Sequence, residues 1–168
     1  MFETLQIRTA TVDDGPAVKR LLESSYPALL ASHYDGDILS EALPILCAPR
    51  LELLSSGRYY IAEHQGAAVA CGGWSLDPPG GVEAAGDVAV IRRFAVVPEL
   101  AGKGLGRRLF QRCERDIGEQ PVERMLVRSS LNAEAFYGGL GFRRLHPIGM
   151  PLPSGRTLPC VLMQRWPV

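Results

Sequence analysis

The sequence lacks several features that would place it in a common class of protein. Its 168 residues contain no run of eighteen apolar residues, and Met1 to Thr4 do not have the charged and then apolar pattern of a signal peptide. Charge of one sign is not in excess, because 18 basic side chains balance 18 acidic ones. A balanced chain has no overall field that recruits nucleic acid or an anionic membrane. We therefore expect a cytoplasmic protein with neither of these partners.

Cysteine and histidine are scarce, and they are spread singly along the chain. They are Cys47, Cys71, Cys113, Cys160, His33, His64 and His146. No Cys-x-x-Cys pair is present, and no histidine falls near a cysteine, so no zinc site is predicted. Reduced thiols are the default in such a chain. We expect no metal.

Length and composition favour a single domain over residues 1–168. Hydrophobic residues make up 46% of the chain and charged residues 21%, which suits a globular protein with a substantial core. Two domains of half this length would each be marginal. No internal repeat or low-complexity segment is present.

Periodicity predicts alternating strands and helices, and hence an α/β (α+β) fold. Strands are expected at 5–9, 59–63, 67–75, 88–97, 125–129 and 158–166, with a tight turn at Gln65-Gly66. Helices are expected at 11–22, 37–46, 51–54, 104–117 and 132–140. Prolines are expected to interrupt regular structure near Pro27, at Pro44 and Pro49, and from Pro147 to Pro153. The turn-rich segment 77–86 is expected to be an exposed loop.

Residues 87–116 carry the strongest functional signal. A β-rich run ends at Pro98, and a helical stripe begins with Leu105. Between them lie Gly102 and Gly104, with Gly106 in the first helical turn, and three cations crowd the same helix start: Lys103, Arg107 and Arg108. Each cation is unfavourable there by roughly 0.3–1 kcal/mol unless an anion is bound. The pattern predicts a phosphate cradle. A solvated basic surface, with the glycines serving only the turn, would look similar.

The spacing of the glycines excludes two common phosphate sites. A Walker loop needs Gly-x4-Gly-Lys followed by Ser or Thr, whereas Lys103 is followed by Gly104. A dinucleotide site needs Gly-x-Gly-x-x-Gly, whereas the spacing here is Gly-x-Gly-x-Gly. Neither a nucleoside triphosphatase nor a Rossmann oxidoreductase is favoured.

The segment instead resembles the acyl-CoA-binding motif of the GNAT superfamily of N-acetyltransferases. That motif is an apolar strand, Val-x-Pro, then Arg/Gln-x-x-Gly-x-Gly/Ala at a helix start, and Leu100 to Gly106 matches it except that Ala101 replaces the Arg or Gln. A second block, Met125 to Phe142, is similar to the family's Asn-x-x-Ala-x-x-Phe-Tyr-x-x-x-Gly-Phe pattern. The two blocks occur in the expected order, and the joint match is more specific than either alone.

The resemblance implies a fold, a reaction and a set of site residues. The fold is a GNAT-like single domain with a mixed, mostly antiparallel sheet of six to seven strands flanked by about four helices. The reaction is direct transfer of an acetyl group from acetyl-CoA to a primary amine, with no metal. Tyr137 is expected to be the general acid that protonates the departing thiolate. The residues expected to bind CoA are Phe94, Ala95, Val96, Ala101, Gly102, Lys103, Gly104, Leu105, Gly106, Arg107 and Asn132.

Several assignments have an alternative that is purely structural. Helical spacing also allows Tyr137 to be a core residue, and Asn132 to be the N-cap of its helix. The pair Arg92-Arg93 breaks the strand alternation, which predicts either a bulge that exposes backbone N–H groups near Phe94 or two arginines at a strand edge.

The general base and the acceptor are not assigned by any motif. The family often has a glutamate in the strand before the phosphate turn, but this strand has none, which leaves Asp87, Glu63, His33 or a water relay as candidates. By resemblance, the segment around Tyr26, His33 and Tyr34 forms one wall of the acceptor site, with the terminal hairpin beside it, although the tyrosines could equally pack at the surface. Trp74 could belong to that wall or to the core.

The sequence is compatible with three functions. The expected one is acetylation of a small-molecule amine. The missing carboxylate and Ala101 also allow a CoA-binding sensor or partner module without catalysis. A protein or peptide N-acetyltransferase is the third. Many members of the family dimerise, so the resemblance also allows a homodimer.

Overall fold

The computed structural model describes residues 4–77 and 87–166. Seven strands form one sheet in the order β1-β2-β3-β4-β5-β7-β6. The strands are β1 Gln6–Thr9, β2 Tyr59–His64, β3 Ala67–Ser75, β4 Val88–Val96, β5 Arg124–Ser130, β6 Arg143–Pro151 and β7 Thr157–Arg165. All neighbouring strands are antiparallel except β4 and β5, which are parallel. The mixed, mostly antiparallel sheet is confirmed.

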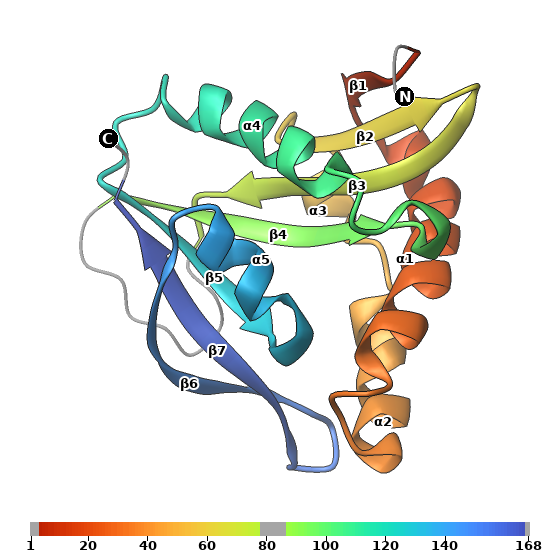
Figure 1. The fold of residues 1–168 in the computed structure, drawn as a ribbon, viewed down its shortest axis with the longest axis vertical. Helices are drawn as coiled ribbons and strands as arrows, with labels where there is room; N and C mark the ends of the chain where they lie inside the picture. Colours follow the sequence, from red (N-terminus) through yellow and green to blue (C-terminus); the bar gives the residue numbers. More distant parts are fainter. Residues whose placement is uncertain (1–3, 78–86, 167–168) are drawn as a thin grey trace.

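Helices cover both faces of the sheet (Figure 1). The helices are α1 Gly15–Leu30, α2 Gly36–Leu46, α3 Leu51–Leu54, α4 Leu105–Ile117 and α5 Glu134–Gly139, and the short 3-10 helices are η1 Val12–Asp14, η2 Pro98–Leu100 and η3 Leu131–Ala133. Side chains of β2 alternate between the two layers, because Tyr60 packs in the cluster of α4 whereas Tyr59 packs with α1 and α3. No helix in the described part of the chain is long and apolar enough to cross a membrane.

The helix after the glycine turn has the buried stripe that its sequence predicts. Leu105, Leu109, Cys113 and Ile117 are each at most 1% exposed and pack against the sheet. This stripe fixes the start of α4 at one edge of the functional site.

The sheet opens between β4 and β5. These strands pair only over Val88–Val90 and Arg124–Leu126, and beyond that point they part (Figure 1). Past the opening, β4 pairs only with β3 and β5 only with β7. The backbone edge of each strand is therefore left facing the gap.

A bulge in β4 lies beside this opening. Cys71 pairs with Ala95 while Gly73 pairs with Arg92, so one residue of β3 opposes two of β4. Arg93 has a φ of 52°, and its carbonyl accepts a hydrogen bond of 2.8 Å from the Tyr59 hydroxyl. The structure thus has the bulge that the Arg92-Arg93 pair suggested.

We expect Gly73→Ala to destabilise the protein by about 1–3 kcal/mol, because the added methyl group overpacks the sheet beside the bulge. A Cβ at Gly73 would lie 2.7 Å from Tyr59 Cα and closer still to the Arg58 carbonyl, so backbone would have to move. Gly36→Ala is the matched control, since a Cβ there has nothing within 4 Å. Urea denaturation compares the two, and equal stability losses would contradict the prediction.

Three expectations about proline were wrong. α1 continues through Pro27 to Leu30, and α2 continues through Pro44 to Leu46. Each proline removes one helical hydrogen bond, and tertiary packing of Leu30 and Ala42, both buried, offsets that loss. Pro147 lies within β6, where it is tolerated because β6 is an edge strand. Apart from Asp77, the predicted loop 77–86 lies outside the described residues.

Candidate active site

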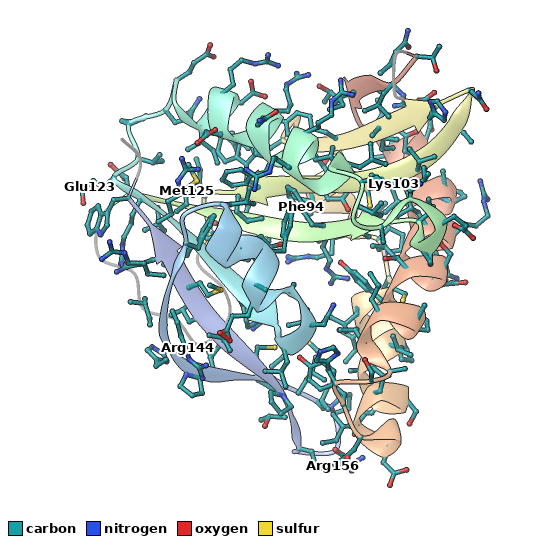
Figure 2. The ribbon with its side chains drawn as sticks, viewed as in Figure 1. Phe94, Lys103, Glu123, Met125, Arg144 and Arg156 are labelled. Atoms are coloured by element: carbon teal, nitrogen blue, oxygen red, sulfur yellow. The ribbon has the colours of Figure 1, made fainter. Side chains whose placement is uncertain are left out.

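A cavity of about 640 Å³ lies where β4 and β5 part. Its walls come from α1, α2, β4, the turn before α4, β5, η3, α5 and the β6–β7 hairpin. Nearly all the residues predicted to bind CoA, and Tyr137, line it: Phe94, Ala95, Val96, Ala101, Gly102, Gly104, Leu105, Gly106, Arg107, Asn132 and Tyr137. Lys103 is not among the lining residues and is exposed in the same turn (Figure 2). The structure therefore brings together two sequence blocks that are far apart in the chain.

The turn before α4 presents backbone to open space. Gly102 and Gly104 have φ values of 76° and 89°, and a Cβ on either would meet nothing within 4 Å. Arg108 donates to the Gly104 carbonyl at 3.1 Å, so the N–H groups of the residues before it have no acceptor within the helix. Gly106 has another role, because a Cβ there would lie 3.0 Å from Phe136 Cζ. It allows α4 to pack closely on α5.

The same turn carries positive charge that no described side chain compensates. The first turn of α4 has no acidic residue, and Lys103, Arg107 and Arg108 form no ion pair with the residues described. Arg107 makes only a long hydrogen bond, 3.4 Å, to the Gly139 carbonyl. Free N–H groups, the positive end of the helix dipole and unpaired cations together favour a phosphate or diphosphate at this place.

The strand β4 offers further backbone donors to the cavity. Val97 N–H donates to the Val69 carbonyl at 2.9 Å, which directs the polar groups of Val97, and by alternation Ala95, toward β3. The N–H groups of Phe94 and Val96 therefore point away from β3, into the gap beside β5. Phe94 is labelled beside β4 in Figure 2, and its carbonyl accepts a hydrogen bond of 3.1 Å from the Tyr26 hydroxyl.

Tyr137 combines a fixed ring with an unbonded hydroxyl. The side chain is 6% exposed, and its ring makes edge contacts with Phe136 at 5.0 Å and Phe142 at 5.6 Å. The hydroxyl has no hydrogen-bond partner among the described residues although it lines the cavity. Burial raises the pKa of Tyr137, and nearby Cys113 raises it further.

Asn132 presents a buried acceptor that has no partner. Its Oδ1 atom is buried without a hydrogen bond in the described part of the chain, and the residue lines the cavity. The alternative role as N-cap of α5 is wrong, because Ala133 is the residue before α5 and no side chain caps the helix. A buried amide oxygen without a partner is costly unless a ligand or water supplies a donor.

None of the three side chains considered as general base lines the cavity. Glu63, on β2, is paired with Arg8 of β1, Asp87 is exposed before β4, and His33 is exposed beside Ser32. Among the described lining residues there is no carboxylate and no imidazole. These candidates were chosen by chemistry alone, and local sequence does not tell on which side of the sheet a distant residue lies. A water relay stays a prediction.

The expected acceptor wall is only partly formed by the aromatic residues proposed for it. Tyr26 lines the cavity, but Tyr34 links other elements, since its hydroxyl donates to the Pro159 carbonyl at 2.7 Å and accepts from Leu131 N–H at 2.8 Å. Trp74 is buried in the core, where Nε1 donates to the Tyr60 hydroxyl at 3.1 Å. Of the two readings of Trp74, the core one is correct.

Sequence reasoning missed a group of arginines in the cavity. Arg92 and Arg93 were considered only for the bulge, and Arg128 was not singled out at all. The available signal was a charged residue at position 128 directly after the apolar run Met125-Leu-Val in β5. Charged side chains are rarely buried unless they are paired, so a cation after an apolar run in a strand indicates a binding role.

Fold and site define a class: a single α/β domain that opens a cavity between two parallel strands, with an anion-binding turn at the head of the following helix. The family model described as "Acetyltransferase (GNAT) domain" matches residues 53–150, which is more than half of the chain. The protein therefore belongs to the GNAT acetyltransferase family, whose members are acetyl-CoA-dependent N-acetyltransferases.

Solved structures share the fold over nearly the whole chain. A GCN5-related N-acetyltransferase from Rhodopseudomonas palustris has a TM-score of 0.79 at 20% identity, with 99% of this chain and 98% of that one covered. PaiA N-acetyltransferase from Thermoplasma acidophilum, in complex with coenzyme A, has a TM-score of 0.74 at 13% identity, covering 96% and 98%. The ribosomal-protein-S18-alanine N-acetyltransferase from Escherichia coli has 0.61 at 18%, covering 97% and 94%. No curated protein matches the sequence.

Proposed function

We propose that this protein transfers an acetyl group from acetyl-CoA to the primary amine of a small molecule, by direct attack, in the cavity between β4 and β5. The observation that carries the proposal is the start of α4, where unpaired cations and free N–H groups face open space at the cavity's edge. The solved structure of PaiA N-acetyltransferase, of the same fold, is a complex with coenzyme A.

Each part of the coenzyme has a matching part of the cavity. The diphosphate is assigned to the turn of Gly102 to Arg107, where helix dipole, amides and charge coincide. The pantetheine amides are assigned to the unpaired backbone of Phe94 and Val96, which extends the sheet into the gap. The Oδ1 atom of Asn132, which is buried without a partner among the described residues, would accept a hydrogen bond from an N–H group of the pantetheine.

The chemistry needs a neutral amine, a stabilised oxyanion and a donor for the leaving sulfur. The amine nitrogen forms a bond to the thioester carbon, the oxyanion is stabilised by β4 N–H groups, and the C–S bond then breaks. Because burial raises its pKa, Tyr137 stays protonated at neutral pH and can hydrogen-bond the departing sulfur in every turnover. The proton lost by the amine replaces any that Tyr137 transfers.

Direct attack is favoured over a covalent cysteine intermediate. Cys160 is the cysteine that lines the cavity, and its Sγ donates to the Leu158 carbonyl at 3.5 Å. Burial raises the pKa of Cys160, which disfavours the thiolate needed for nucleophilic catalysis. The cysteine is therefore a poor acyl carrier.

The enclosure of the acceptor side supports a small acceptor. α2 packs on the β6–β7 hairpin through Ala42, Met150 and Leu158, and Tyr34 ties the α1–α2 connection to β7. These contacts hold α2 and the hairpin together beside the cavity, which favours a small acceptor over a polypeptide that would need an open groove. We propose a cytoplasmic enzyme whose partner is such a molecule. A homodimer stays a prediction.

The test combines binding with turnover. We expect titration calorimetry to show CoA binding in the range of about 1 μM to 1 mM, and acetyl-CoA with a mixed amine panel to release free CoA thiol. Absence of CoA binding by folded protein would overturn the proposal. Binding without thiol release above background would favour a CoA sensor, and turnover with peptides alone would favour a protein acetyltransferase.

A further inference from the structure

The acceptor side of the cavity is cationic and has no internal counter-ion. Arg92, Arg93 and Arg128 line it together with an apolar surface, and no carboxylate is among the described lining residues. The remaining lining cation, Arg107, is at the other end, in the phosphate turn. An apolar cavity with several guanidinium groups and no anionic partner among the described lining residues is unusual, because desolvated charges are normally paired.

The strand register puts two of these arginines on the same face of the sheet. The last pair of the β4–β5 ladder is Val90 with Leu126. Arg92 and Arg128 each follow two residues later, so both lie on the face of Val90 and Leu126. A continued ladder would have set the two cations directly opposite each other, which is unfavourable. The strands part at this point instead.

The three arginines differ in how far their donors are used. Arg93 is tied to the end of α2 through Nη1 alone, which donates to the carbonyls of Ile45 at 3.1 Å, Ala48 at 3.3 Å and Leu46. Arg92 uses Nε and Nη2, which donate to Ser75 Oγ at 2.9 Å and the Asp77 carbonyl at 2.8 Å. Its Nη1 has no acceptor among the described residues. Arg128 makes no hydrogen bond or ion pair with any described residue.

Electrostatics agrees with the geometry. Burial first, and then the neighbouring charges of Arg50, Arg128 and Arg93, together lower the pKa of Arg92 to about 10, against an opposing effect of Asp77. Burial also lowers the pKa of Arg128, partly opposed by Cys160 and aided by Arg93. The charged form of both guanidinium groups is thus less stable here than in water, and a bound anion would stabilise it.

Resting on the acetyl transfer proposed above, we propose that the acceptor is a small primary amine bearing an anionic group, a carboxylate or a phosphate, that is bound by Arg92 and Arg128. The planar guanidinium matches either anion with two parallel hydrogen bonds. Tyr26, Leu30 and Met150, among the lining residues, offer an apolar surface for the part of the acceptor between anion and amine.

This arrangement also compensates for the missing general base. An ordinary alkylamine, with a pKa of about 10.4, is neutral in roughly one molecule in a few thousand at pH 7. An apolar cavity with cations close to the amine disfavours a further positive charge and so raises the neutral fraction. The ammonium proton is lost to solvent on entry, and no side-chain carboxylate is needed.

The experiment uses matched pairs of amines that differ only in charge: aminocarboxylates with their amides, and aminoalkyl phosphates with the parent amino alcohols. We expect wild-type kcat/KM to favour the anionic member of a pair, and the favoured pair identifies the anion. In Arg128→Gln, kcat/KM for the anionic member should fall by roughly 10- to 150-fold, mainly through KM, as expected for loss of a charged hydrogen bond. The neutral member should lose much less, only the share that Arg128 contributes to the neutral fraction of the amine, and the CoA dissociation constant should hardly change.

Arg124→Gln is the matched control, because it removes the same charge from the same strand outside the cavity, where Arg124 donates to Gln164 Oε1 at 3.0 Å. Equal use of both members by wild type, or equal losses for both in Arg128→Gln, would overturn the proposal. If no amine is acetylated, the proposed function fails. The anion site is then tested separately, by titration of the same pairs of amines into CoA-loaded protein. Anion binding that requires Arg128 would support the anion site, and its absence would overturn it.

Discussion

Gly104→Asp should abolish coenzyme A binding while leaving the protein folded. Gly104 has a φ of 89° and stands directly before α4, with nothing within 4 Å of where a Cβ would be. The carboxylate would therefore occupy the open space assigned to the diphosphate and repel it. Like charges in contact are unfavourable by several kcal/mol, so we expect CoA affinity to fall by at least about 100-fold in titration calorimetry.

Gly57→Asp is the control for this substitution. Gly57 has a φ of 77°, again with no atom near a Cβ, so the variant adds the same strain and the same charge away from α4. Both variants should lose similar, small amounts of thermal stability, and Gly57→Asp should bind CoA normally. Gly104→Asn separates charge from bulk, because it retains the size and removes the charge. Wild-type affinity in folded Gly104→Asp would mean that the diphosphate lies elsewhere.

The coenzyme side of the site could be predicted because its determinants are local. The stripe of Leu105, Leu109, Cys113 and Ile117 defines the helix, and the glycines and cations before it define the anion site within one short segment. Tyr137 and Asn132 follow in a second short segment with its own spacing. Backbone amides at a helix start need no distant partner, so the sequence contains most of the information.

The acceptor side could not be predicted because it is assembled from distant elements. Arg92 and Arg128 line the same cavity only because β4 and β5 are parallel neighbours in a particular register, which no local pattern specifies. Asp87 and Glu63 suited a base by chemistry, but the topology leaves them outside the cavity. The prolines misled for a related reason. From the sequence, each proline indicates only a lost hydrogen bond. The packing that offsets this loss at Pro27, and the edge position at which Pro147 is tolerated, come from the tertiary structure.

The coenzyme side and the acceptor side of the cavity are expected to bind their substrates in the same way. Anion recognition is expected at both ends, with the turn before α4 holding one ligand and the pair Arg92 and Arg128 the other. The reacting atoms would then meet in the apolar middle, near Phe94 and Tyr137. Fixing both substrates by distant charges leaves the centre free for orientation and for exclusion of water, which favours a neutral amine.

Tyr137→Phe should lower kcat by roughly 100- to 10,000-fold, the range expected for loss of a proton donor, with the CoA dissociation constant unchanged within a small factor. The ring contacts with Phe136 and Phe142 survive the substitution, and the lost hydroxyl has no hydrogen bond to any described residue. Stability should therefore be preserved. Rapid measurement of thiol release at saturating acetyl-CoA, beside calorimetry with CoA, separates turnover from binding.

Tyr60→Phe provides the opposite pattern as a control. The Tyr60 hydroxyl donates a hydrogen bond to the Asp116 carboxylate and accepts one from Trp74 Nε1. Tyr60 is not among the residues that line the cavity. Its loss should destabilise the protein by about 1.5–3 kcal/mol, as for a hydrogen bond to a charged group, without changing kcat.

Because burial raises the pKa of Tyr137, deprotonation of this residue should cause no fall in wild-type kcat below about pH 10. Equal kcat values in wild type and Tyr137→Phe would remove Tyr137 as the donor, and leave the departing sulfur to solvent.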